Sequence, residues 1–84
     1  ATDDSTTVVL RNKITELAHC IDPALSIHDF RMVPGPTHTN LIFDVVTPFG
    51  FRLEDAEVAR QLRALIRTFD SHYVPVIQVE HSYI

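Results

Sequence analysis

The sequence predicts an α+β fold in which one helix, two strands, a second helix and a third strand follow one another. β-branched and aromatic residues fill residues 26–46 on both sides of a Pro34-Gly35-Pro36 turn, as in a hairpin. A helical pattern of apolar residues lies before this hairpin and another lies after it. A last apolar run over 73–82 supplies the third strand.

The 84 residues form a single domain, 1–84, whose net charge of −4 argues against nucleic acid as a partner. Apolar residues make up 45% of the chain, which is typical of a globular protein. No apolar run approaches the ~18 residues that a membrane span needs. The single cysteine, Cys20, excludes an internal disulfide and indicates a reducing compartment.

The first helix is predicted after a flexible start over 1–7, although Asp4, Ser5 and Thr6 can each cap it. Its apolar stripe has a spacing of three to four residues and consists of Leu10, Ile14, Leu17, Ala18 and Ile21. Cys20 is expected to be a small core residue. The helix ends at Asp22-Pro23, since the residue before proline avoids the helical region.

The first strand is predicted over 26–33, and the hairpin ends at 47–50. Because side chains alternate along a strand, His28 should share a face with Phe30 and Met32. Ile27 and Val33 should lie on the other face. In the second strand the two predicted faces are Leu41, Phe43 and Val45 against Ile42 and Val46.

The second helix begins at Leu53-Glu54-Asp55, where acidic residues suit the positive end of the helix dipole. Its apolar stripe consists of Val58, Ala59, Leu62, Leu65, Ile66 and Phe69. In the strand that follows, His81 should share a face with Ile77 and Val79. A right-handed crossover makes this strand parallel to the second one. The result is a two-layer, ferredoxin-like sandwich with a three-stranded mixed sheet and both helices on one face.

Both faces of the predicted sheet carry apolar residues, yet two helices can cover only one face. A loop could cover part of the second face. A second copy of the chain is the alternative that we favour, because so short a chain has a thin core. We therefore expect a homodimer.

Two histidines on different strands, His28 and His81, are candidate metal ligands, since imidazole suits zinc and similar ions. The simpler alternative is that each is an ordinary hydrogen-bonded or exposed histidine. Glu57 is most simply a surface acid in the first turn of the second helix. No catalytic set is visible, and only Gly35 and Gly50 could contribute to a phosphate-binding loop, so we expect no enzyme activity.

The motifs Ile27-His28-Asp29-Phe30-Arg31, Gly35-Pro36, Leu53-Glu54-Asp55-Ala56-Glu57-Val58-Ala59 and Val76-Ile77-Gln78-Val79-Glu80-His81 occur in this order. Together, from about Val8 to Tyr83, they resemble the cytoplasmic C-terminal domain of cation diffusion facilitator transporters. The resemblance implies a metallochaperone-like fold and a homodimer that regulates efflux of a divalent metal. It also implies a membrane domain in the same protein, and a location at the cytoplasmic face of the membrane.

By position, the resemblance assigns metal ligands to His28 and His81, and Glu57 falls where many members have a histidine. Zinc is the expected ion, with manganese, iron or cobalt as alternatives. Two family ligands are replaced, by Phe43 and Tyr83, so the domain is expected to bind one metal weakly or none. The alternative function is a free-standing metallochaperone-like or small-ligand-binding domain. The absence of an initial Met indicates a processed chain or an excised domain.

Overall fold

The five predicted elements occur in the predicted order in a computed structural model, which describes residues 4–83. They are α1 (Asp4–Ile21), β1 (Ser26–Pro34), β2 (Thr39–Pro48), α2 (Asp55–Phe69) and β3 (Tyr73–Ser82). Because α1 begins at Asp4, residues 4–7 are helical, contrary to the flexible start expected over 1–7. Residues 1–3 lie outside the described residues.

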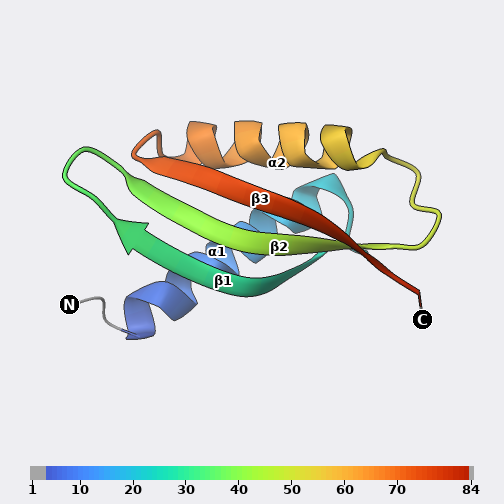
Figure 1. The fold of residues 1–84 in the computed structure, drawn as a ribbon, viewed down its shortest axis with the longest axis horizontal. Helices are drawn as coiled ribbons and strands as arrows, with labels where there is room; N and C mark the ends of the chain where they lie inside the picture. The colour runs from blue at the N-terminus through green and yellow to red at the C-terminus, as the bar shows by residue number, and fades with distance from the viewer. Residues whose placement is uncertain (1–3, 84) are drawn as a thin grey trace.

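The sheet has the strand order β1-β2-β3 and is mixed, as predicted (Figure 1). β1 is antiparallel to β2, and β3 is parallel to β2 because α2 forms the crossover between them. The hairpin turn requires glycine. The Gly35 N–H donates to the His38 carbonyl over 2.9 Å, and a Cβ at Gly35 would lie 2.9 Å from that oxygen.

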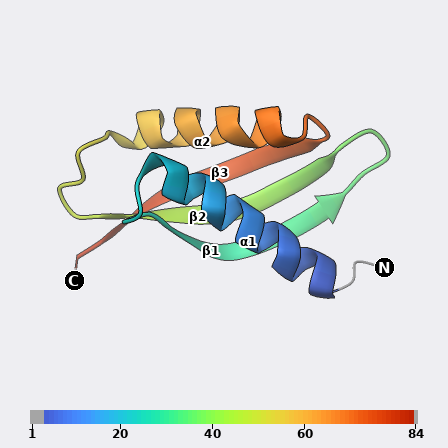
Figure 2. The same cartoon turned by 180° about the vertical axis from the view of Figure 1, so that it is seen from behind.

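Both helices lie on one side of the sheet, which we call the closed face. Figure 1 views the opposite side, and in Figure 2 α1 runs in front of β1 and β2. The buried core lies between the layers and consists of Leu10, Ile14, Ala18, Leu25, Leu41, Phe43, Val45, Val58, Leu62 and Ile66. The predicted stripes of both helices supply six of these residues. Cys20 is exposed, so its predicted place in the core is wrong.

The second side of the sheet, the open face, is covered by no element among residues 4–83. β2 defines the two faces, because its residues alternate strictly between buried and half-buried. The strand register then assigns to the open face Ser26, His28, Arg31 and Val33 of β1, Asn40, Ile42, Asp44 and Val46 of β2, and Val74, Val76, Gln78 and Glu80 of β3.

A β-bulge in β1 overturns the predicted faces of that strand. His28 is opposite Asp44 and Arg31 is opposite Ile42, so two residues of β1 occupy the space of one on β2. The first of them, Asp29, has a φ of 55°. The extra residue shifts the alternation, and His28 therefore does not share a face with the two residues that the sequence grouped with it.

The bulge directs three apolar side chains of β1 into the core. Ile27, Phe30 and Met32 all pack against it, whereas Val33 remains 47% exposed. Phe30 stacks on Phe43 of the neighbouring strand, with ring centroids 6.0 Å apart. The predicted pairing of Ile27 with Val33 on one face is therefore also wrong.

Candidate functional site

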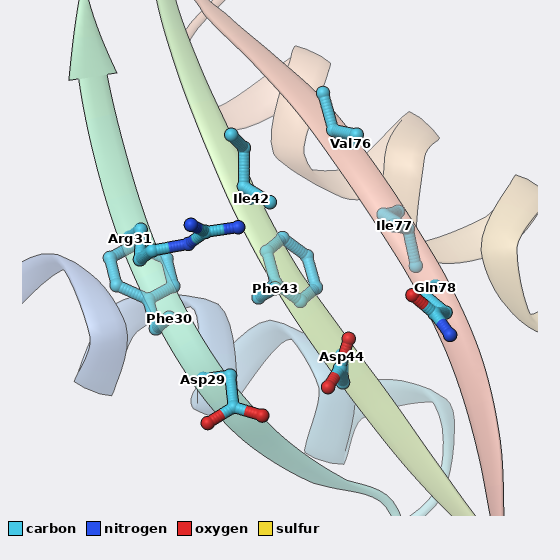
Figure 3. A pocket seen from close by; sticks show the side chains of 9 residues that line it. All are labelled: Asp29, Phe30, Arg31, Ile42, Phe43, Asp44, Val76, Ile77 and Gln78. Carbon is cyan, nitrogen blue, oxygen red and sulfur yellow. The ribbon is translucent and has the colours of Figure 1, made fainter.

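A hollow with a volume of about 830 Å³ lies in the open face, and the bulge residues Asp29 and Phe30 are part of its lining. Residues of all three strands line it (Figure 3). Arg31, Ile42 and Asp44 lie on the viewer's side of the strands in Figure 3, whereas the Phe43 ring passes behind them towards the helices. The rim of the hollow is thus built from the open face, and its floor reaches the edge of the core.

The polar groups around the hollow are free to bind. Arg31 contributes a guanidinium, Asp29 and Asp44 contribute carboxylates, and Gln78 contributes an amide. None of these side chains makes a hydrogen bond or ion pair with another residue of 4–83. With Val76 half exposed beside them, they can recognise a ligand or a surface that carries both charges and apolar groups.

His28, the first predicted metal ligand, lies on this open face. Its Nε2 is 3.3 Å from Ser26 Oγ, and its backbone is opposite Asp44 in the register. The side chain is exposed. His28 is not among the residues that line the hollow, and Ser26 is its only side-chain partner among residues 4–83.

His81, the second predicted ligand, lies at the far end of β3 on the closed side. Its Nδ1 is 3.1 Å from Thr47 Oγ1, and its Nε2 is 3.0 Å from Asp55 Oδ2. Thr47 is 1% exposed, and Asp55 begins α2. Both ring nitrogens are occupied by contacts that join the ends of β2 and β3 to α2, so a metal would have to displace one of them.

Glu57, the third predicted ligand, is held by its own helix. The Arg60 guanidinium donates to both of its carboxylate oxygens, over 2.9 and 2.6 Å, and Gln61 Nε2 donates over 2.6 Å. These hydrogen bonds, with the nearby positive charge, lower the pKa of Glu57 to about 2. The Glu57 carboxylate is therefore bound in a surface hydrogen-bond network of its own helix, which agrees with the prediction of a surface acid.

The three predicted ligands therefore do not meet within one chain. His28 lies on the open face, and His81 and Glu57 lie on the side of the helices. Among the described residues, no three His, Cys, Asp or Glu side chains gather as a possible metal site. Phe43 is 1% exposed in the core, and Tyr83 stacks at the surface against Phe49, with ring centroids 5.4 Å apart. Residues 43 and 83 thus supply no metal ligand.

None of the residues that line the hollow was a candidate site residue on the sequence; Arg31, Val76 and Gln78 are examples. Nothing in the spacing of these three residues indicates that they converge, because they lie on the two edge strands and meet only through the register with β2.

No helix within residues 4–83 is long and apolar enough to cross a membrane. Comparison with protein-family models, with curated proteins and with solved structures finds no match to this chain.

Proposed function

We propose that this chain is the dimerising regulatory domain of a divalent-cation efflux transporter, located at the cytoplasmic face of the membrane and attached to a membrane domain of the same protein. The observation that carries the proposal is the open face. A sheet with helices on one side only exposes Ile42 and Val76 on the other, and such a surface favours a second copy. The αββαβ order and the family resemblance support the transporter context.

In this role the domain does no chemistry of its own. Its pairing holds two transporter chains together on the cytoplasmic side. A condition that strengthens or weakens the pairing changes the population of the paired state by no more than its differential affinity allows.

The first test is the oligomeric state of the isolated domain by sedimentation equilibrium. We expect a homodimer at tens of micromolar. A monomer throughout that range would contradict the proposal.

Regulation by metal belongs to the same proposal. The ligands of one chain do not form a site, and a structural zinc site has four ligands, so any bound ion would be shared between subunits and weakly held. Calorimetric titration with zinc and with manganese tests this on the wild type and on a His28→Ala/His81→Ala variant. We expect weak heats that the double variant loses; equal heats from both proteins would remove these histidines from the site.

A second candidate function is favoured by the hollow itself. Its volume of about 830 Å³ falls within the ~300–1,000 Å³ of small-molecule sites, which supports a free-standing small-ligand or metallochaperone-like domain. The parent reading frame separates the two candidates. About six apolar runs of membrane-span length upstream of Ala1 would support the transporter, and their absence would favour the small-ligand domain.

A further inference from the structure

We propose that the outer edge of β3 binds an extended acidic segment of a partner protein, which joins the sheet as a fourth strand beside α2. The outer edge is the side of β3 that faces away from β2, because β3 is the last strand in the order β1-β2-β3. This surface is separate from the open face and does not depend on dimerisation. The proposal rests on the unpaired backbone groups of β3 and on the charges that α2 places beside them.

Two backbone hydrogen bonds establish which residues of β3 face the outer edge. The Thr39 N–H donates to the His72 carbonyl over 3.1 Å, and the Phe49 N–H donates to the Ser82 carbonyl over 2.9 Å. The register of β2 and β3 runs without a shift between these two bonds. In a parallel pair, alternate residues turn both backbone groups towards the neighbouring strand. The even-numbered residues of β3 therefore bond to β2, and the odd-numbered residues within 73–81 direct their backbone groups to the outer edge.

The end of the outer edge near the hairpin turn is blocked. The Tyr73 N–H donates to the Asp70 carbonyl over 3.2 Å, and Arg67 Nη1 donates to the Tyr73 carbonyl over 3.5 Å. Pro75 has no N–H, and at an outward-facing position of an edge strand it removes no hydrogen bond from the sheet. Side-chain caps and prolines of this kind protect an edge strand from unwanted pairing.

Beyond Pro75 the outer edge is not blocked. The backbone N–H and C=O groups of Ile77, Val79 and His81 have no hydrogen-bond partner among residues 4–83. They recur every second residue, so an extended chain about 4.8 Å away can bond to all of them. The outer edge of β1 offers no such regular row, because the bulge at Asp29 interrupts it.

The helix α2 supplies a second surface beside these residues. Figures 1 and 2 view the sheet from opposite sides, and in both α2 lies beyond the outer edge of β3. The contact of Arg67 with the Tyr73 carbonyl identifies the flank of α2 that points towards this edge. Arg63 and Ala59 precede Arg67 on the same flank at a spacing of four residues. A strand added to β3 would therefore pass beside these three side chains.

The arginines on this flank of α2 have no acidic partner. Arg63 and Arg67 are exposed, and neither forms an ion pair with a residue of 4–83, whereas Arg60 of the same helix is bound to Glu57. Acidic side chains on the helix side of an added strand would pair with the two unpaired guanidinium groups. The small side chain of Ala59 leaves room for an apolar group further along the strand. This charge complementarity selects an acidic partner, although the chain itself carries a net charge of −4.

A second copy of the chain fits the outer edge poorly. An antiparallel pair of β3 strands needs a two-fold axis perpendicular to the sheet, which keeps both α2 helices on the same side. Each helix extends beyond its own edge, so the two helices would overlap there. A parallel pair about an axis along the strands would place each N–H opposite the identical N–H, where no hydrogen bond forms.

Fluorescence anisotropy tests the partner with a labelled octapeptide that alternates glutamate and valine and has blocked ends. We expect binding that saturates below ~1 mM peptide, and no binding of the matching lysine and valine peptide. Arg63→Glu should raise the Kd at least ~5-fold, because it replaces an attractive surface pair by a repulsive one. The matched control is Arg11→Glu, which makes the same charge change at an exposed position of α1 and should leave the Kd unchanged.

Amide hydrogen exchange followed by NMR tests the backbone contacts. In the free protein, the even-numbered residues of 76–80 should exchange slowly, whereas Ile77, Val79 and His81 should exchange fast. Adding the glutamate peptide should slow the exchange of these three amides. The same peptide with methyl groups on alternate backbone nitrogens loses its donors and should bind at least ~10-fold more weakly, since several hydrogen bonds are removed.

The outcomes separate this proposal from the proposed dimer. Absence of saturation by ~1 mM glutamate peptide, or equal binding of the lysine peptide, overturns the acidic partner. Protection of Ile77, Val79 and His81 in the free protein that disappears on dilution assigns the edge to a second copy, which overturns this proposal and leaves dimerisation standing. A monomeric wild type whose three edge amides are protected by the peptide supports the proposal and overturns the dimer.

Discussion

The closed and open faces of the sheet are built from the same strand and differ in nearly every physical property. On β2, Leu41, Phe43 and Val45 are at most 1% exposed, and both helices contribute to the core that they join. Their neighbours Ile42 and Asp44 point the other way, are only half-buried and border a hollow with unpaired charges. The closed face stabilises the chain, whereas the open face is available for binding.

The edges of the two faces also differ in how their polar groups are used. At the end of the closed face, Thr47, His81 and Asp55 contact one another and join three elements. On the open face, Arg31 and Asp44 have no side-chain partner among the described residues. Polar groups that serve the fold are paired, and unpaired polar groups mark the surface where a partner or ligand can bind.

The largest expected difference between the faces is in the free energy of unfolding. Leu62→Ala removes a side chain with 0% exposure from the closed side and should cost about 2–5 kcal/mol. Val76→Ala on the open face should cost less than about 1 kcal/mol, because half of that side chain is already in water. Urea denaturation, at a protein concentration low enough for monomers to dominate, measures both. Equal losses would remove the energetic distinction between the faces.

A smaller loss is expected where the closed face ends in polar contacts. Thr47→Val removes a buried hydroxyl that contacts His81 Nδ1 and the Glu80 carbonyl, and should cost about 1–3 kcal/mol. Thr37→Val is the matched control, because its hydroxyl contacts His38 at an exposed position. The same denaturation experiment compares them, and a Thr47→Val protein as stable as the control would show that this contact does not stabilise the fold.

The bulge that separates the two faces in β1 gives the next prediction. Asp29 has a φ of 55°, which a β-branched residue adopts only at a cost. Asp29→Val should therefore lose about 1–2 kcal/mol of stability. Asp29→Asn should stay close to the wild type, since asparagine tolerates this conformation. Thermal melting of the two variants decides it, and an unaffected Asp29→Val protein would mean that the bulge is not strained in this way.

The smallest effect concerns pH and the exposed side of the helical layer. The Arg60 and Gln61 hydrogen bonds hold the pKa of Glu57 at about 2, below its ordinary value of 4.5. A lowered pKa contributes stability that is present above pH 4.5 and is lost as the pH falls from there towards 2. Glu57→Gln should therefore flatten the loss of stability in this window, by a small amount because solvent screens the pair.

Unfolding measured between pH 5 and pH 2 checks this expectation over the window that the Glu57 pKa defines. The control is Glu16→Gln, which removes a carboxylate 4.0 Å from Lys13 Nζ and should retain the wild-type profile. A Glu57→Gln protein with the wild-type slope would mean that this network does not contribute to acid sensitivity.

The elements and their order could be predicted because their signals are local. Pro34-Gly35-Pro36 and Asp22-Pro23 restrict the backbone wherever they occur in a chain, and the helical stripes report a helix period. The third strand was predicted at 73–82, which are the bounds of β3. The first strand was predicted at 26–33 and extends one residue further, to Pro34.

The candidate site was much less predictable, because its geometry depends on contacts between distant residues. The bulge that begins at Asp29 shows only in the register with β2, where Phe30 stacks against Phe43, thirteen residues later in the sequence. Because of the bulge, His28 does not share a face with Phe30 and Met32, and the hollow lies beside the bulge. An argument from the alternation of side chains along a strand cannot detect the bulge. One inserted residue moves every later side chain of the strand to the opposite face.

The sequence by itself determined the residue types, the five elements and the mixed sheet, because propensity, turn chemistry and crossover handedness act over short stretches of chain. The tertiary structure alone decided which side each side chain occupies: His28 on the open face, His81 joined to Thr47 and Asp55, and Glu57 bound to Arg60. These placements follow from strand register and from the packing of helices against one face, which are properties of the whole chain.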